Sequence, residues 1–284
     1  MLPPRETTAR AKALGSLGFD FGRVASRLTD AAVRAGAAIM RHCHGDPEVQ
    51  LKGDASPVTR ADRNSEAIIL AALAQFAPEV KVICEETFGG ASGPLPHRFF
   101  LVDPLDGTKE FIQKRSDFTI NIALIEGGRP RFGLVYAPAR ALLAVTIEAG
   151  KAVEVELPPN EAGADLDRLN PKPIHARVAE NSGLTALVSH SHLDPETEAF
   201  LAKLNIAERV GVGSSIKFVA IARGEADVYP RFGPTMEWDT AAGQAVLEAA
   251  GGRVVDTNDE PLRYGKTEQS LRNPSFVAWG RGSS

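Results

Sequence analysis

The sequence predicts a layered α+β and α/β sandwich. An N-terminal antiparallel sheet with helices is followed by a smaller C-terminal mixed sheet with helices. Three observations support this fold class: amphipathic helical segments open the chain, hairpins fill its middle, and strands alternate with helices in its last part. With 284 residues, of which 43% are hydrophobic, the chain is long enough for two packed halves.

The first helical segment has apolar residues at three- and four-residue spacing, which is typical of a helix that buries one stripe. These residues are Phe21, Val24, Leu28, Ala31, Ala32, Ala35 and Ile39. A second helix is expected over residues 63–76, because Pro78 follows it closely. Residues 80–84 then form a short β-branched strand that leads directly into Glu85 and Glu86.

The middle of the chain predicts successive β-hairpins. Turn-forming residues at 126–129 and 148–151 separate apolar, β-branched runs. The strands expected here cover residues 99–102, 118–125, 131–136 and 142–147. Hairpins of this kind build an antiparallel sheet, and the absence of Gly-x-Gly-x-x-Gly from the sequence argues against a Rossmann dinucleotide site.

A segment rich in Pro, Asn, Asp and Gly at residues 158–173 predicts the junction between two domains. The N-terminal domain then covers residues 20–157 and the C-terminal domain residues 174–284. In the second domain, strands are expected at 186–189, 208–212, 226–229 and 253–256, and helices at 195–204, 214–223 and 239–250. This alternation predicts a smaller α/β layer.

Composition restricts the class of partner and the compartment. The formal net charge of −4 argues against a nucleic-acid polymer as the main partner, although metal ions could still bring an anionic ligand to the protein. Cys43 and Cys84 lack metal-ligand spacing, and two thiols in a reducing cytoplasm are favoured over a single disulfide, which stays open. The longest apolar run, at residues 67–73, is too short to span a bilayer, and charged residues at the N-terminus argue against a secretory signal. We therefore expect a soluble, cytoplasmic monomer or homodimer; peripheral membrane association stays open.

The most specific motif, Asp-Pro-Leu-Asp-Gly-Thr, covers residues 103–108. Asp103 and Asp106 can face one point on this turn, where two like charges are tolerated only if a cation lies between them. Pro104 favours a bend that can add the Leu105 carbonyl as a further oxygen ligand. Taken alone, the motif has another interpretation, an Asx-turn with a helix N-cap.

Gly107 and Thr108 begin a helical segment whose free backbone N–H groups suit a phosphate oxygen. Glu85 at the end of a strand and Asp239 at the start of a helix accompany the motif. Carboxylates with a carbonyl form a hard oxygen site that suits Mg²⁺ rather than zinc or copper. The alternatives are a solvated acid at Glu85, a plain N-cap at Asp239 and a structural Ca²⁺ loop, which would not need these two distant acids.

These motifs together resemble the inositol monophosphatase superfamily over about residues 21–279. The matching segments, in the expected order, are Glu85-Glu86, Asp103 to Ile112 and Trp238-Asp239. Finer detail is similar to the branch of 3'(2'),5'-bisphosphate nucleotidases, in Asp103 to Ile112, in Asp117 to Ile125 and at residues 189–192, 213–218 and 229–232. The resemblance implies an αβαβα sandwich in which the N-terminal domain carries the metal site and the C-terminal domain completes the substrate pocket.

The implied activity is a phosphomonoesterase that removes the 3'-phosphate of adenosine 3',5'-bisphosphate, a by-product of sulfate activation, to give AMP and phosphate. By resemblance the cofactor is Mg²⁺, with two or three ions per site, and Li⁺ inhibits. The implied metal ligands are Glu85, Asp103, the Leu105 carbonyl, Asp106 and Asp239. Thr108 with Asp62 would orient and deprotonate the attacking water, without a covalent phosphoenzyme. For Asp62 the alternative is a cap of the following helix.

The implied substrate-binding residues are Gly107, Thr108, His192, Ser214, Lys217, Arg231 and Asp239. Lys217 and the start of its helix could share one anion, Arg231 could add a bidentate contact, and His192 could donate a hydrogen bond near the ribose or phosphate. Alternatively, Lys217 lies on a solvated helix face, Arg231 in a surface ion pair and His192 in a loop.

Competing functions share parts of this site. An inositol monophosphatase or a histidinol-phosphatase would keep the metal site and change the pocket, and a nucleotide-binding protein of the same fold would have lost catalysis. Cys84 stands where many members of the family have Gly. Its thiol could make the activity sensitive to oxidants, or it could be a small buried apolar residue.

Overall fold

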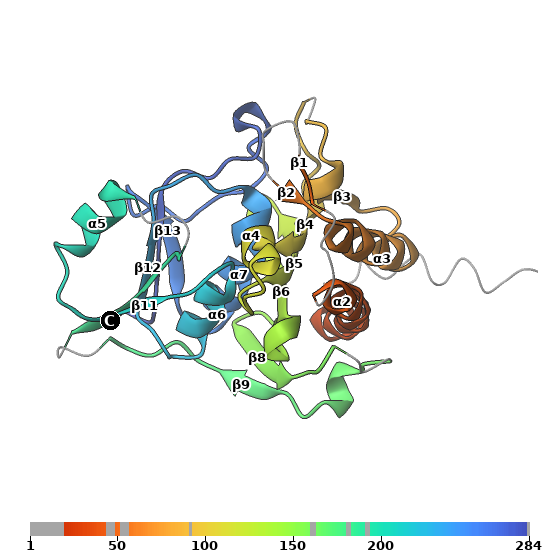
Figure 1. Cartoon of the computed structure of the whole chain (residues 1–284), viewed down its shortest axis with the longest axis horizontal. Coiled ribbons are helices and arrows are strands. Elements are labelled where there is room, and N and C mark those ends of the chain that lie inside the picture. The colour runs from red at the N-terminus through yellow and green to blue at the C-terminus, as the bar shows by residue number, and fades with distance from the viewer. Residues whose placement is uncertain are drawn as a thin grey trace, which may run out of the picture.

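The computed structural model describes residues 20–43, 49–51, 57–90, 93–159, 163–179, 183–190 and 194–282. Its elements stack in the order helices, sheet, helices, sheet, helix (Figure 1). The layered fold class predicted from the sequence is confirmed. In the described part of the chain, no helix combines the length and the hydrophobicity needed to cross a membrane.

The outer helices α2 (Phe21–His42) and α3 (Arg60–Phe76) pack against each other and cover one face of the larger sheet (Figure 1). The structure places the start of α3 three residues earlier than the sequence predicts, because Thr59 and Asp62 form a capping box there. The Thr59 hydroxyl accepts from Ala61 N at 3.1 Å, and Asp62 Oδ2 accepts from Thr59 N at 2.8 Å. A buried acid is thereby fixed in the first turn of α3.

The larger sheet has seven strands that follow one another in chain order. They are β3 (Lys81–Cys84), β4 (Arg98–Asp106), β5 (Thr119–Glu126), β6 (Arg129–Ala137), β7 (Leu142–Glu148), β8 (Lys151–Glu156) and β9 (Lys172–Ile174). All neighbours are antiparallel except β3 and β4, which are parallel. The antiparallel pairing predicted for the successive hairpins is thus confirmed, and β3, which was not assigned to this sheet from the sequence, adds a parallel strand at its edge.

The helices α6 (Ile216–Ala222) and α7 (Glu237–Ala249) lie between the two sheets (Figure 1). Small residues allow α7 to approach its neighbours closely. A Cβ on Gly133 of β6 would lie 2.3 Å from the Ala242 carbonyl oxygen, and a Cβ on Gly243 would lie 2.5 Å from the Phe218 ring. These glycines therefore set the distance between α7, β6 and α6.

The smaller sheet has the strand order β11-β10-β12-β14-β13, and α5 (Pro195–Leu201) lies outside it. Its strands are β10 (Leu184–Val188), β11 (Ile206–Gly211), β12 (Val228–Arg231), β13 (Arg253–Asp256) and β14 (Phe276–Trp279). Parallel pairs join β10 to β11 and β12, and antiparallel pairs join β14 to β12 and β13. The predicted mixed sheet is thus confirmed, and β14 is an additional strand.

Short elements complete the chain: β1 (Gln50–Leu51), β2 (Pro57–Val58), the 3₁₀ turn η1 (Glu85–Thr87) and the helix α4 (Thr108–Ile112). Three further 3₁₀ turns are η2 (Pro138–Arg140), η3 (Leu166–Arg168) and η4 (Thr267–Gln269). The domain division at residues 158–173 stays a prediction. Strand β9 begins inside that range and pairs with β8 of the larger sheet.

Candidate functional site

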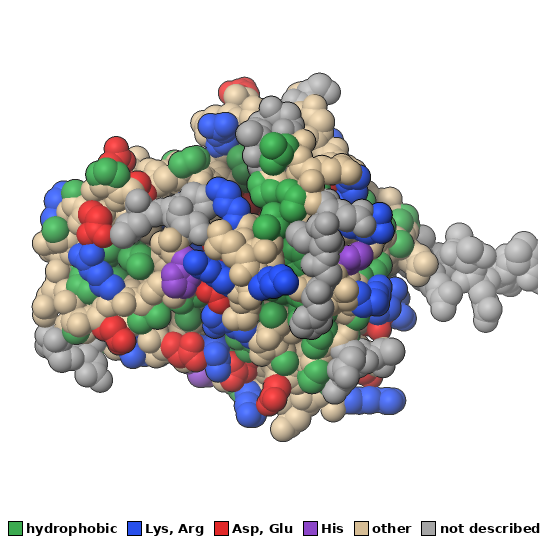
Figure 2. Space-filling model, viewed as in Figure 1, with side chains coloured by type: hydrophobic (Ala, Val, Ile, Leu, Met, Phe, Trp, Pro, Cys, Tyr) green, Lys and Arg blue, Asp and Glu red, His purple; other side chains and the backbone are tan. Residues whose placement is uncertain are grey.

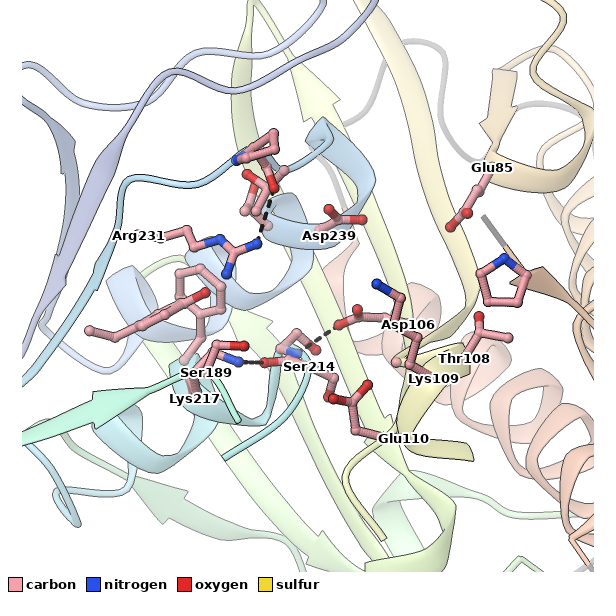
Figure 3. A pocket seen from close by; sticks show the side chains of 18 residues that line it. Glu85, Asp106, Thr108, Lys109, Glu110, Ser189, Ser214, Lys217, Arg231 and Asp239 are labelled. Carbon is pink, nitrogen blue, oxygen red and sulfur yellow. Dashed lines mark hydrogen bonds between the residues drawn. The ribbon is translucent and has the colours of Figure 1, made fainter. Parts of the chain in front are cut away.

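One pocket brings together residues from both sheets and from the helices between them (Figure 3). Glu85 and Thr108 project from one side, Lys217 and Arg231 from the opposite side, and Asp106 and Asp239 lie between these pairs. Gly107 and Ser214, also predicted as substrate-binding residues, line the same pocket. His192 lies outside the described residues.

Three acids form a compact group at this pocket: two of them line it, and the buried Asp103 lies next to these two. Glu85, Asp103 and Asp239 each offer a carboxylate oxygen, and these oxygens all lie within 4.8 Å of one another. The parallel pairing of β3 with β4 explains part of this arrangement. Cys84, the last residue of β3, lies opposite Val102 of β4. The residues that follow these two, Glu85 and Asp103, therefore come at the same end of the strand pair. Asp239 joins them from the first turn of α7.

The electrostatics of the group indicate a cation site. Burial, and then the charges of Glu85, Asp106 and Asp239, raise the pKa of Asp103 well above its usual value. Burial, and then the charges of Asp106 and Glu85, likewise raise the pKa of Asp239. A divalent cation would offset this repulsion, and a donor set of carboxylate oxygens fits Mg²⁺.

Asp106 lies beside the group and links it to the opposite wall of the pocket. Its Oδ2 accepts from Ser215 N at 2.7 Å, and Asn121 and Thr119 contact the same oxygen at 3.4 Å. Burial raises the pKa of Asp106 to about 6, although the nearby Lys217 ammonium and the Ser215 N–H act in the opposite direction. The pKa of Asp106 therefore depends both on the acids of the candidate metal site and on the Lys217 ammonium.

The turn after Asp103 is held by hydrogen bonds on both sides. Leu105 N donates to Asp103 Oδ1 at 3.0 Å, and Ser65 Oγ of α3 donates to the Pro104 carbonyl at 2.7 Å. The Leu105 carbonyl, predicted as a metal ligand, accepts from Thr108 Oγ1 at 3.2 Å. This carbonyl thus lies on the side of the turn that faces Thr108.

Thr108 and Asp62 are in hydrogen-bond contact. Thr108 Oγ1 lies 3.1 Å from Asp62 Oδ1, while Asp62 Oδ2 accepts from the Thr59 N–H and hydroxyl at 2.8 and 2.6 Å. Asp62 is only 1% exposed; burial raises its pKa, and the Thr59 bonds oppose that shift. One oxygen of Asp62 thus caps α3, as the alternative interpretation expected, and the other contacts Thr108; the catalytic role of the pair stays a prediction.

Gly107 requires its glycine. Its φ is +90°, and a Cβ there would lie 2.8 Å from the Asp117 carbonyl oxygen. The predicted helical segment that follows is α4, which starts at Thr108 and has only five residues. Binding of a phosphate oxygen at Gly107 and Thr108 stays a prediction.

Lys217 is buried in the wall of the pocket, so the interpretation as a solvated helix residue is wrong. Its ammonium donates to the carbonyls of Ser214 at 2.6 Å and Val212 at 3.1 Å, and it lies 4.9 Å from the centre of the Tyr229 ring. Burial lowers the pKa of Lys217 to about 8, and the Asp106 carboxylate acts against this shift. Helix α6 starts two residues later than predicted, after Ser214, whose φ is +50°.

Arg231 is also buried, at the end of β12, so it does not lie at the surface as the alternative interpretation expected. Its Nη2 donates to the Pro234 carbonyl at 3.1 Å.

On the face shown in Figure 2, basic and acidic side chains lie close together over the middle layer of helices. The described residues of that face therefore lack the uniform positive charge typical of nucleic-acid binding.

Sequence reasoning missed several lining residues. Lys109 and Glu110 follow Thr108 directly, so their adjacency to the motif was an available signal. Ser189, Tyr229 and Thr235 lie at or after strand ends that the sequence places, but only the fold brings them to one pocket.

The two cysteines agree with the sequence-based prediction of thiols rather than a disulfide. Both Cys43 and Cys84 are free thiols. Cys84 is buried, and burial followed by the charge of Glu66 raises the pKa of its thiol, so the thiolate is disfavoured. The prediction of a small buried apolar residue is confirmed.

Comparisons with known proteins agree with this geometry. The model of the inositol monophosphatase family matches residues 22–278. The 3'(2'),5'-bisphosphate nucleotidase CysQ of Escherichia coli (strain K12) is 42% identical over 248 residues, which cover 86% of this chain and 95% of that protein. The CysQ of Buchnera aphidicola is 34% identical over 260 residues, covering 90% and 93%.

Solved structures show the same similarity. The crystal structure of CysQ from Bacteroides thetaiotaomicron, a bacterial member of the inositol monophosphatase family, superposes with a TM-score of 0.77 at 37% identity, covering 92% of this chain and 98% of that one. Inositol monophosphatase-II from Staphylococcus aureus, at 20% identity and a TM-score of 0.72, shares the fold over 92% of this chain and 89% of its own.

Proposed function

The chain belongs to the inositol monophosphatase family, and from this premise we propose that it removes the 3'-phosphate of adenosine 3',5'-bisphosphate, giving AMP and phosphate. The observation that carries the proposal is the arrangement within one pocket. The group of three acids lies beside the Thr108–Asp62 pair. Across the pocket from it are two buried cations, Lys217 and Arg231. A substrate with two phosphates can engage both sides.

The residues present fit a magnesium cofactor. Glu85, Asp103 and Asp239 would hold it, with Asp106 and the Leu105 carbonyl as the further oxygen donors. When bound there, Mg²⁺ supplies Lewis-acid stabilisation of the phosphoryl oxygens and lowers the pKa of a water molecule. We expect two or three ions per site, and inhibition by Li⁺ through occupation of one magnesium position.

The protein's own groups would handle the proton. Thr108 Oγ1 has one proton, directed at Asp62 Oδ1 or the Leu105 carbonyl, so its lone pairs can accept a hydrogen bond from the attacking water. As the water attacks phosphorus, its proton moves to Thr108 Oγ1 while the hydroxyl proton moves to Asp62 Oδ1. The bond from phosphorus to the 3' oxygen breaks as the water bonds in line on the opposite side, so no covalent phosphoenzyme forms. The 3' oxygen takes a proton from solvent and leaves as the hydroxyl of AMP.

The opposite side of the pocket would bind the 5'-phosphate. A lysine ammonium has three N–H donors, and Lys217 gives two of them to the Ser214 and Val212 carbonyls. Those two bonds fix the direction of the third donor. Arg231 adds a guanidinium, whose planar donors match a phosphate. Buried cations bind anions more strongly than exposed ones, because water screens them less.

The deciding experiment is phosphate release with Mg²⁺, with and without Li⁺, from adenosine 3',5'-bisphosphate, inositol 1-phosphate and histidinol phosphate. We expect a strong preference for the bisphosphate, and inhibition by Li⁺. A preference for either monophosphate would keep the metal site and overturn the second-phosphate pocket. Absence of turnover with all three substrates would favour the non-catalytic nucleotide-binding alternative.

Lys217→Met is expected to change substrate preference. Because the variant loses a buried charge-assisted hydrogen bond to the second phosphate, kcat/KM for the bisphosphate should fall about 100-fold. The value for inositol 1-phosphate should change by less than about threefold, since that substrate has no second phosphate. Lys203→Met, at an exposed position, is the matched control. Equal losses with both substrates would contradict the assignment of Lys217.

The pH dependence of KM follows from the same residue. Lys217, with its pKa lowered to about 8, carries its charge at pH 7 and loses most of it by pH 9. Affinity for the second phosphate is therefore present below pH 8 and lost above it, so KM for the bisphosphate should rise about tenfold between pH 7 and pH 9. Lys217→Arg keeps its charge over this range and should flatten the profile. An unchanged profile in that variant would assign the titration to another group.

A further inference from the structure

The first turn of α7 determines where the Asp239 carboxylate lies. Asp239 Oδ2 accepts from the N–H of Met236 at 2.7 Å, so the side chain folds back onto the start of its own helix. The carboxylate therefore moves with this turn. Any rotation of the turn would change the distances from Asp239 to Glu85 and Asp103.

Glu237, two residues earlier, ties the same turn to a neighbouring loop. It is fully buried at 0% exposure. Its Oε2 accepts from Gly265 N at 2.6 Å, and its Oε1 accepts from Lys266 N at 2.9 Å and lies 2.7 Å from Lys266 Nζ. A buried carboxylate is costly unless it is paired and hydrogen-bonded. Here both oxygens have partners, and all of those partners belong to one loop.

The rest of that loop, residues 264–273, adds bonds to the same turn. Glu237 N donates to the Leu271 carbonyl at 2.8 Å, and Asn273 Nδ2 donates to the Met236 carbonyl at 2.7 Å and to Thr240 Oγ1 at 2.9 Å. Ser270 and the buried Leu271 have φ values of +53° and +59°, a region that residues with side chains rarely adopt. Such a backbone persists only where its surroundings determine it strongly.

The same turn also contacts the residue that follows η1, the element that carries Glu85. The Trp238 and Phe88 rings meet edge to face, with centroids 5.4 Å apart, and Phe88 directly follows η1. The turn with Asp239 thus contacts both Phe88 and the 264–273 loop.

From these contacts we propose that Glu237, held by Lys266, is a positioning residue for Asp239 and thereby sets the metal affinity of the site. The inference rests on the proposed function, because it takes Asp239 to be a metal ligand. Groups that hold a metal ligand in place typically change metal affinity or activity 10- to 100-fold when they are replaced. Glu237 acts through the backbone of its helix turn, so its loss loosens Asp239 without removing a ligand.

Glu237→Gln tests this proposal, since it keeps the size of the side chain and removes its charge. Mn²⁺ affinity without substrate, measured from the electron paramagnetic resonance signal of free Mn²⁺, should fall about tenfold. The Mg²⁺ concentration for half-maximal turnover should rise by about the same factor, whereas kcat at saturating Mg²⁺ should stay within about threefold. Glu268→Gln, an exposed acid of the same loop, should leave all three values unchanged.

Lys266→Met provides the second variant, because it removes the partner of Glu237 from a position that is 20% exposed. It should lower Mn²⁺ affinity in the same direction, and the double variant should bind Mn²⁺ no more weakly than Glu237→Gln alone. Wild-type Mn²⁺ affinity in a folded Glu237→Gln or Lys266→Met protein, even with a lower Tm, would overturn the positioning role. Failure of the wild-type protein to bind Mn²⁺ or to hydrolyse the bisphosphate would instead overturn the proposed function.

Discussion

Asp103→Asn is expected to lower kcat/KM for the bisphosphate by about 10³-fold or more, because a metal ligand contributes several kcal/mol of transition-state stabilisation. Asp103 is 1% exposed and belongs to the group of oxygens within 4.8 Å. An asparagine oxygen can still accept from Leu105 N, so the turn at residues 103–108 should keep its shape. The loss would therefore report on charge and metal binding rather than on folding.

Stability gives this prediction a second readout. Burial and neighbouring acids raise the pKa of Asp103, which means that its charge destabilises the fold when no cation is bound. In EDTA, the Tm of Asp103→Asn should therefore equal or exceed that of the wild type, and added Mg²⁺ should stabilise the variant less than the wild type. Asp167→Asn, at an exposed position, is the control for both measurements. Near-wild-type turnover in Asp103→Asn would contradict its assignment as a metal ligand. Asp239→Asn should lose turnover to a similar extent as Asp103→Asn.

The fold was predictable where a local pattern carries the signal. The stripe on α2 and the hairpins of the larger sheet depend on periodicity and turn residues, both of which the sequence displays. The direction of β3 was not predictable, because a strand is parallel or antiparallel only relative to its partner. Strands β9 and β14 were missed for a related reason: they are short, and β14 pairs with two strands distant in sequence.

The candidate site, like the fold, was predictable only where a local motif carries the signal. Its acids stand in motifs of fixed spacing, and the structure brings Glu85, Asp103 and Asp239 together. The burial of Lys217 and the contact of Glu237 with residues 265–266 arise from packing between elements far apart in the chain. Sequence patterns show which residue types are present, but they do not show which acid will be paired with a lysine.

Thr108→Val should reduce kcat by about 10²- to 10³-fold, in the range of a lost general base, with little change in the Mg²⁺ concentration for half-maximal turnover. The valine side chain has nearly the same volume but cannot exchange a proton with Asp62 or the water. Thr108→Ser retains the hydroxyl and should recover most of the activity. A large fall in Mg²⁺ affinity instead would make Thr108 a metal-binding residue.

Asp62→Asn tests whether Thr108 and Asp62 act as one unit. The single variant should lose activity to a similar extent as Thr108→Val, and about 1 kcal/mol of stability, because its amide replaces a capping carboxylate of α3. If the proton passes from water through Thr108 to Asp62, the double variant should be no slower than the worse single variant, since groups that work in series are not additive. Multiplicative losses in kcat, compared at saturating Mg²⁺, would mean that the two residues act separately. Asp62 would then contribute through the capping box and the orientation of α3, and Thr108 through direct contact with the phosphate.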